Sequence, residues 1–224
     1  MKEVSKSPNK ISNMFNEIAN VYDRNNDIIS LGLHRIVKKF AIEEFNPNYN
    51  EIVVDLCCGT GDICGYLLKY VKSNNIIGVD FSSEMLNIAR HKYPSLKFIQ
   101  ADISDVPQET SRVDKITICF GLRNVENRDK VIAEMHRILK PDGEILHIDF
   151  GNKNCFSKIF DLIVLLLIKL FRKNAESYEY LIHSKSQFPV PKELIEEFKK
   201  ANFELKKCKN FIFGVVSMQI YKKI

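Results

Sequence analysis

The sequence predicts a doubly wound α/β fold built on a mostly parallel sheet of seven strands, preceded by a helical extension. Short apolar runs of strand length alternate with segments whose apolar residues recur three and four positions apart. This alternation is typical of parallel strands joined by helical crossovers. Of the 224 residues, 45% are hydrophobic and 27% are charged. That composition fits one globular domain over residues 1–224 and excludes a disordered chain.

The elements are expected in the following order. A helical region over residues 12–40 comes first, with a break around Ser30–Gly32, and such an extension commonly folds over the carboxyl ends of the strands. Strands are expected at Glu51–Leu56, Ile76–Asp80, Leu96–Gln100, Lys115–Phe120, Glu144–Phe150, Phe203–Cys208 and Phe213–Tyr221. Helices are expected at Asp62–Lys72, Ser83–Tyr93, Arg128–Leu139 and Lys192–Ala201, and a helical insertion over residues 152–190, continuous through Tyr180, follows the fifth strand.

Charge and cysteine usage narrow the class of protein. The formal net charge of +5 is spread thinly and forms no Lys/Arg block, so a nucleic-acid partner is not expected. Six cysteines fall at irregular spacings without a Cys-x-x-Cys pair, which indicates a reducing compartment and favours no zinc site. The first residues do not have the pattern of a cleavable apolar leader. We therefore expect a cytoplasmic protein without a metal.

The most apolar stretch is Ile159–Phe171, where Asp161 and Lys169 confine the uncharged part to a few residues. A membrane span needs ~20 apolar residues, so this stretch does not predict one. Two readings remain open. The segment is either a core helix, or an interfacial or lid helix that meets a lipid-like ligand with help from Lys158, Lys169, Arg172 and Lys173.

The clearest chemical signal is the glycine loop between the first strand and the next helix. Gly59 and Gly61 allow the backbone to turn tightly and to approach a ligand without interference from Cβ atoms. Asp80 ends the second strand about 20 residues further on, the separation at which a carboxylate reaches the paired hydroxyls of a ribose. Phe81 and Met85 follow directly and are candidates for the apolar wall beside an adenine. The loop therefore predicts an adenosine ligand.

Acidic residues around this loop indicate which adenosine ligand binds. Asp55 lies before the glycines, Asp62 begins the helix and Asp102 follows the third strand. A dinucleotide carries a pyrophosphate, which prefers a helix N-terminus free of acids. S-adenosylmethionine carries an ammonium and a sulfonium instead, so the acids favour it. The spacing of Asp55, the glycines, Asp80 and Asp102 resembles the cofactor motifs of the Rossmann-like class I methyltransferases.

Three further segments resemble one family, the C-methyltransferases of ubiquinone and menaquinone biosynthesis. They are Tyr22–Arg35, Phe120–Val125 and Arg137–Gly143, and the similarity runs from Met14 to Lys222. The resemblance implies cofactor contacts at Thr60, Asp80, Asp102, Ile103 and Cys119, the last of which stands where the family commonly has serine.

The resemblance also implies the reaction. It is the S-adenosylmethionine-dependent C-methylation of a polyprenylated quinol, which is demethylmenaquinol, the 2-polyprenyl-6-methoxy-1,4-benzoquinol of ubiquinone synthesis, or both. Two alternatives stay open: a small-molecule O- or N-methyltransferase, and a non-catalytic cofactor-binding subunit of a quinone-synthesis complex. A homodimer, or a place in such a complex, and peripheral contact with the inner face of the membrane would fit a substrate of this kind.

Methyl transfer to carbon requires an electron-rich ring, which a quinol provides when a hydroxyl loses its proton. Candidates for this chemistry are Tyr22, Asp23, His34, Arg123 and Asn124. His34 has the intrinsic pKa of a base near neutral pH, whereas Arg123 stays protonated and suits an oxyanion or a bound water. Asn124 is a candidate for the second ring oxygen. Alternatively, His34 belongs to a polar helix face and Asp23 caps a helix.

Overall fold

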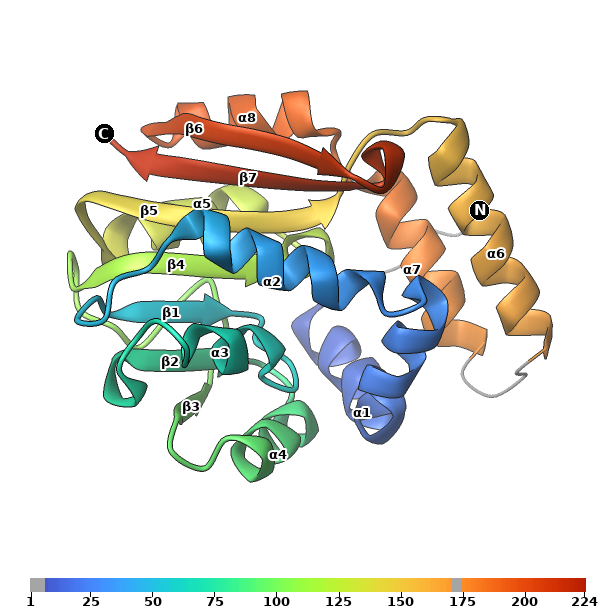
Figure 1. The fold of residues 1–224 in the computed structure, drawn as a ribbon, viewed down its shortest axis with the longest axis horizontal. Helices are drawn as coiled ribbons and strands as arrows, with labels where there is room; N and C mark the ends of the chain where they lie inside the picture. Colours follow the sequence, from blue (N-terminus) through green and yellow to red (C-terminus); the bar gives the residue numbers. More distant parts are fainter. Residues whose placement is uncertain (1–6, 171–174) are drawn as a thin grey trace.

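A seven-stranded sheet in the order β3-β2-β1-β4-β5-β7-β6 forms the centre of the computed structural model, which describes residues 7–170 and 175–224 (Figure 1). Neighbouring strands from β3 to β5 are parallel, whereas β7 runs antiparallel to both β5 and β6. The strands are β1 Val53–Leu56, β2 Ile76–Asp80, β3 Lys97–Gln100, β4 Val113–Cys119, β5 Leu139–Phe150, β6 Phe203–Phe211 and β7 Val216–Lys223. The expected mostly parallel sheet is confirmed.

Helices cover both faces of the sheet and bury its apolar side chains. One core cluster joins the sheet to α2, α3 and α4, and a second joins it to α5 and α8. This two-sided packing explains why all four residues of β1 and four of the five residues of β2 are buried. The helices are α1 Pro8–Ser30, α2 Leu33–Phe45, α3 Asp62–Leu67, α4 Ser83–Lys92, α5 Arg128–Ile138, α6 Cys155–Leu170, α7 Ala175–Gln187 and α8 Pro191–Lys200, with short 3-10 turns η1 Ser73–Asn75, η2 Leu122–Asn124 and η3 Ile212–Gly214.

Three helices gather beyond the carboxyl ends of the parallel strands. Figure 1 shows α1, α6 and α7 at the end to which the arrowheads of β1, β4 and β5 point. The break between α1 and α2 falls where the sequence indicated it, because Leu31 and Gly32 both adopt a left-handed backbone with φ of 50° and 73°. The N-terminal extension therefore lies at the edge where doubly wound sheets bind ligands.

Two of the expected helical segments differ from the structure. The helix expected over Asp62–Lys72 ends at Leu67, because Lys69 and Tyr70 donate hydrogen bonds to carbonyls three residues back and tighten the chain into turns. These turns bring Val71 into the core. The helical insertion divides into α6 and α7, and α7 continues beyond Tyr180 to Gln187.

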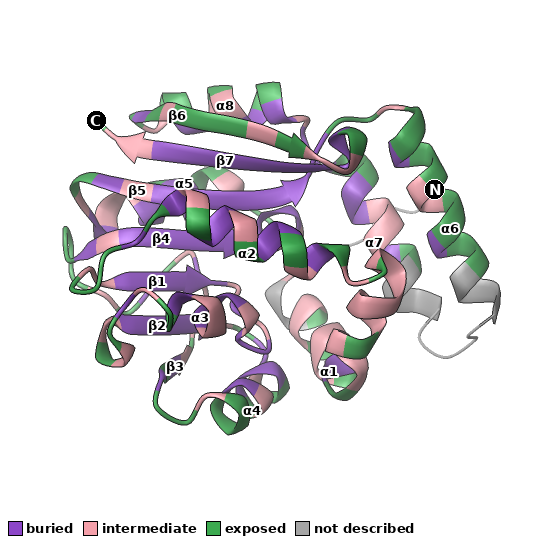
Figure 2. Ribbon diagram, in the orientation of Figure 1, coloured by how far each residue is buried: buried purple, intermediate pink, exposed green. Residues whose placement is uncertain are grey.

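The described side chains of α6 divide into a buried and an exposed side. Val164 is fully buried and Ser157 nearly so, but Ile159, Leu162 and Leu166 on the outer side are each more than half exposed. Figure 2 shows much of α6 in the colour of exposed residues, outside α7. Among its described side chains α6 thus buries one side only, which favours the interfacial or lid reading. Arg172 and Lys173, named with the interfacial reading, lie outside the described residues, as does the side chain of Lys169.

Within the described ranges, no helix is long and apolar enough to cross a bilayer. The same part of the chain contains no group of three His, Cys, Asp or Glu side chains arranged to hold a metal ion.

Candidate functional site

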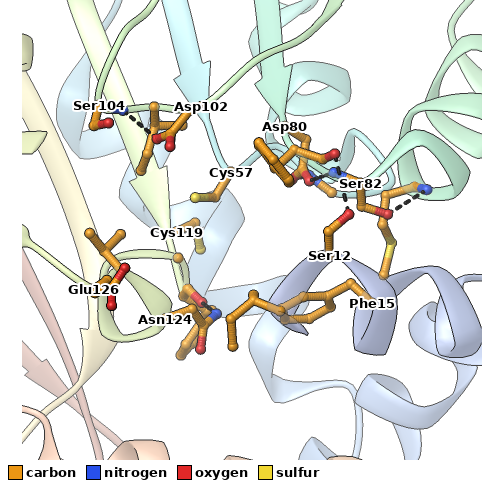
Figure 3. Close-up of a pocket in the computed structure, with 18 of the residues that line it drawn as sticks. Ser12, Phe15, Cys57, Asp80, Ser82, Asp102, Ser104, Cys119, Asn124 and Glu126 are labelled. Atoms are coloured by element: carbon orange, nitrogen blue, oxygen red, sulfur yellow. Dashed lines mark hydrogen bonds between the residues drawn. The ribbon is translucent and has the colours of Figure 1, made fainter. Parts of the chain in front are cut away.

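A cavity of about 290 Å³ lies at the carboxyl edge of the sheet, between the strand ends and α1. Figure 3 shows Asp80 and Asp102 across this cavity from Phe15 and Asn124. Nine of the candidate site residues named from the sequence line it, namely Tyr22, Gly59, Asp80, Phe81, Met85, Asp102, Ile103, Cys119 and Asn124. Asp23, His34, Asp55, Thr60, Gly61 and Arg123 are not among the lining residues.

The glycine loop is open to the cavity at one glycine and packed at the other. Gly59 has a positive φ of 54°, and a Cβ there would meet no protein atom within 4 Å. Gly61 has a φ of 84°, and a Cβ there would lie only 3.1 Å from the Tyr93 ring and 3.3 Å from Ala89. Gly61 therefore permits the close packing of the loop, while Gly59 leaves its backbone accessible to a ligand.

Asp80 is fixed by two backbone groups at the tip of β2. The amide of Gly59 donates to Oδ2 at 2.8 Å, and the amide of Ser82 donates to Oδ1 at 2.9 Å. Burial raises the pKa of Asp80, and the two amides act in the opposite direction. Each carboxylate oxygen has further lone pairs, so the side chain can still accept hydrogen bonds from two ligand hydroxyls.

The acids of the loop carry less free negative charge than their number suggested. Asp62 accepts a hydrogen bond from Lys38 Nζ at 3.1 Å and has Lys92 and Arg35 within 4 Å. Asp55 is only 1% exposed and accepts hydrogen bonds from Thr117 Oγ1 and Cys64 Sγ. Among the three acids, only Asp102 lines the cavity. The repulsion of a pyrophosphate expected from the sequence is therefore weaker than three free carboxylates would give.

Asp55 provides a prediction about stability. Burial raises its pKa to about 7, against an ordinary value of 3.8. The folded state consequently holds a proton that the unfolded state releases between pH 4 and 7, and stability falls as the pH rises through this window. We expect Asp55→Asn to remove that dependence, so that its stability relative to the wild type improves by up to ~4 kcal/mol from pH 4 to pH 8. Urea unfolding at several pH values measures this difference.

The matched control for Asp55 is Thr117→Val, which removes a hydrogen bond to the carboxylate but leaves the titrating group in place. Because that hydrogen bond lowers the pKa of Asp55, the variant should keep the fall in stability with rising pH and extend it to higher pH. Parallel stability profiles for Asp55→Asn and the wild type would show that Asp55 is ionised in the folded protein throughout the range.

Helix α1 closes one side of the cavity and is held there by side chains. Asn16 Oδ1 accepts from Ser82 Oγ at 2.6 Å, and Asp23 Oδ1 accepts from Thr60 Oγ1 at 2.6 Å. Asp23 also forms an ion pair with Lys92 of α4. Thr60 and Asp23 thus join the glycine loop to α1. Ile11, Ser12 and Phe15 line the cavity from α1, and only the expected position of the extension pointed to them in advance.

A second, smaller cavity of about 60 Å³ adjoins the first and shares Phe15 and Tyr22 with it. Its polar lining comes from Tyr22, Asn25, Asn26, Arg123 and Tyr180, and its apolar lining from α1 and α7. The structure thus places Arg123 on the smaller cavity and Asn124 on the larger one. Tyr180 connects the two sites, because its hydroxyl donates to Asn124 Oδ1 at 3.1 Å.

Arg123 is buried against Asp149 at the end of β5. Its Nη1 donates to Asp149 Oδ1 at 3.1 Å and to the carbonyl of Phe120. Arg123 Nε and Asp149 Oδ2 are both buried without a hydrogen-bond partner in the described structure. Buried polar groups of proteins are nearly always paired, and this exception belongs to an arginine that lines the smaller cavity. Neither Asp149 nor Tyr180 carried a signal in the sequence as a site residue.

His34 lines neither cavity. Its Nε2 lies 2.9 Å from Asp27 Oδ1, and Asp27 also accepts from Arg35. Burial is the main cause that lowers the pKa of His34.

The doubly wound sheet, with a glycine loop after its first strand and an acid at the tip of its second, defines a class I S-adenosylmethionine-dependent methyltransferase. Solved structures of S-adenosylmethionine-dependent methyltransferases share this fold. The structure from Thermotoga maritima superposes with a TM-score of 0.69 and 18% sequence identity, and the match covers 95% of this chain and 99% of that one. The structure from Aquifex aeolicus has a TM-score of 0.60 and 16% identity, and the match covers 84% of this chain and 89% of that one.

Within this class, the chain belongs to the ubiE/COQ5 methyltransferase family, whose sequence profile matches residues 2–223. The Campylobacter jejuni (strain NCTC 11168) protein named ubiquinone/menaquinone biosynthesis C-methyltransferase UbiE is 36% identical over 96% of this chain and 98% of its own length. The demethylmenaquinone methyltransferases of Oceanobacillus iheyensis and Staphylococcus aureus (strain MRSA252) are each 33% identical, over 98% and 96% of this chain and 98% and 93% of their own. The expected family, methyltransferase activity and cofactor are confirmed.

Proposed function

We propose that the chain transfers a methyl group to a ring carbon of a polyprenylated quinol, with demethylmenaquinol as its first substrate and the ubiquinone precursor as a second. Two of the relatives are named for demethylmenaquinone, and the name of the Campylobacter jejuni relative covers both quinones. The observation that carries the proposal is the pair of adjoining cavities, one beside the glycine loop and the other beside Arg123, which share Phe15 and Tyr22.

We assign S-adenosylmethionine to the larger cavity. Asp80 would accept from the ribose hydroxyls, Phe81 would contact the adenine, and the open backbone at Gly59 would allow close approach. Asp102, Ile103 and Cys119 would complete the lining. Three residues behind this surface would hold the loop in place. Thr60 donates a hydrogen bond to Asp23, and Gly61 allows close packing against Tyr93. Asp55 accepts a hydrogen bond from Thr117.

We assign the quinol ring to the smaller cavity. The bound cofactor supplies an electrophilic methyl group on a sulfonium, so the protein has to make the ring carbon a better nucleophile. The guanidinium of Arg123 would donate to the ring oxygen and stabilise the phenolate that forms as the hydroxyl gives its proton to water. Tyr180, which donates to Asn124 on the wall of the larger cavity, would orient the ring, and Tyr22 lies where the two cavities meet.

Asp23 and His34 are candidate residues that line neither cavity. Asp23 positions α1 through Thr60 and Lys92, and so keeps Phe15 and Tyr22 over the strand ends. A proton-transfer role for His34 stays a prediction.

The reaction itself is the direct test. The protein is incubated with S-adenosylmethionine labelled in its methyl group and with a reduced short-chain demethylmenaquinol, and we expect the label on a ring carbon of the product. The oxidised quinone should take up no label, because its ring is electron-poor. Label on an oxygen would indicate an O-methyltransferase instead. Absence of label from a folded protein that binds the cofactor would favour the non-catalytic subunit.

A further inference from the structure

An exposed apolar surface runs along α6 and ends at η3. We call it the apolar ridge, and its residues are Phe156, Ile159, Leu162, Ile163, Leu166 and Phe213. Their exposed fractions range from 42% to 75%, and the rings of Phe156 and Phe213 stack on each other with centroids 4.6 Å apart. Most exposed apolar side chains on protein surfaces are scattered singly, whereas a contiguous patch of this kind marks an interaction site.

The inner side of α6 already has its packing partners, so the ridge is not an unfinished core. Val164 is fully buried, and the Phe160 ring lies 5.7 Å from that of Phe150. Lys185 of α7 sits over the Phe160 ring at 5.1 Å and donates to the carbonyl of Ser157. The apolar side chains on the outer side therefore have a purpose other than folding.

Charge around the ridge favours an anionic partner. Asp161, the only acid on α6, is paired with Lys185 Nζ at 2.5 Å. Lys153 and Lys158 are exposed at the N-terminal end of the helix, and neither has an ion-pair partner within the described residues. The ridge thus combines an apolar strip with uncompensated positive charge, which is the pattern of helices that lie in a membrane interface.

The ridge is also next to the smaller cavity. Helix α6 packs on α7, which contributes Tyr180 and Leu181 to the lining of that cavity. Figure 1 shows α6 outside α7 at the ligand-binding end of the sheet. A bilayer in contact with α6 would therefore lie one helix away from the lining of the smaller cavity.

We propose that the apolar ridge docks the protein on an anionic lipid bilayer, with Lys153 and Lys158 at the headgroups and α6 parallel to the surface. A bilayer supplies both an apolar phase and negative charge, whereas a second copy of this chain would bring only the same unpaired lysines. The inference rests on the proposed function in one respect: a bilayer is the phase in which the proposed polyprenylated substrate dissolves.

Binding to vesicles tests the proposal without any catalytic step. The full chain is sedimented with vesicles of phosphatidylcholine alone and of phosphatidylcholine with one quarter phosphatidylglycerol. We expect preferential binding to the anionic vesicles. The double variant Leu162→Ser/Leu166→Ser should bind them about fivefold more weakly. Lys153→Gln/Lys158→Gln should weaken binding to anionic vesicles by about fivefold or more and leave binding to neutral vesicles unchanged.

The matched control replaces two exposed apolar side chains far from α6, Leu68→Ser and Ile224→Ser, and should bind as the wild type does. Unchanged vesicle binding by the ridge variant would overturn the proposal. So would a ridge variant that only converts a dimer to a monomer in sedimentation, because the ridge would then be a protein interface. A drop of several degrees in its melting temperature would also contradict an exposed ridge.

A soluble quinol without a tail separates this proposal from the proposed function. The ridge variant should methylate such a quinol as fast as the wild type, and should lose rate only with a long-tailed quinol in vesicles. Vesicle binding by a wild-type protein that methylates neither quinol would leave the docking surface intact and refute the quinol substrate.

Discussion

Replacing Arg123 with methionine is expected to lower kcat by ~100-fold or more while the affinity for the cofactor stays unchanged. Removing one donor from a developing oxyanion typically costs this much in rate. Arg123 lines the smaller cavity and not the larger one, so its loss should act on the methyl acceptor alone. Single-turnover rates with a saturating quinol measure the chemical step, and calorimetry with S-adenosylhomocysteine measures the cofactor site.

The interpretation needs a variant that folds. Arg123→Met leaves Asp149 buried and uncompensated, a change that commonly costs 3–5 kcal/mol of stability, about half of what a domain has. The double variant Arg123→Met/Asp149→Asn removes both charges and should fold while remaining slow. Arg128→Met is the matched control, because this arginine pairs with Glu197 outside both cavities. A double variant with wild-type kcat would exclude Arg123 from the reaction.

The sequence could predict those features that depend on local spacing. The alternation of strands and helices, the break at Leu31–Gly32, and the pairing of Gly59 with Asp80 all follow from residues close together in the chain or at a fixed separation along it. The sheet then brings the two strand tips side by side because β1 and β2 are neighbours. This is why the cofactor half of the site could be read before the structure.

The features that depend on distant partners could not be predicted. Asp149 follows Arg123 by 26 residues, and Tyr180 follows Asn124 by 56, so no periodicity links either pair. The ion-pair partners of the acids in the loop could not be predicted for the same reason. Their charge was visible in the sequence, but the neutralisation of Asp62 by Lys38 across 24 residues was not. Residues on α1 and α7 enter the site only because both helices fold over the same edge of the sheet.

Asp80 provides the largest expected effect on the cofactor. We expect Asp80→Ala to weaken S-adenosylhomocysteine binding by ~10-fold at least, and by ~100-fold or more if two ribose hydroxyls depend on it, because each hydrogen bond to a charged group contributes ~1.5–3 kcal/mol. Loss of the acceptor for the Gly59 and Ser82 amides will loosen the loop as well. Affinity alone therefore does not separate a direct contact with the ribose from a distorted loop.

A thermodynamic cycle separates the two causes. The wild type and Asp80→Ala are each titrated with S-adenosylhomocysteine and with its 2′-deoxy analogue. If Asp80 accepts from the 2′-hydroxyl, the wild type will prefer the ribose form by ~10-fold and Asp80→Ala will have lost most of this preference, because a coupled pair is not additive. If the variant only distorts the loop, it will bind both forms weakly and keep the full preference. Asp105→Ala, an exposed acid near the same edge that does not line the cavity, should leave both affinities unchanged. A preference for the ribose form that survives in Asp80→Ala would assign the hydroxyls to another residue.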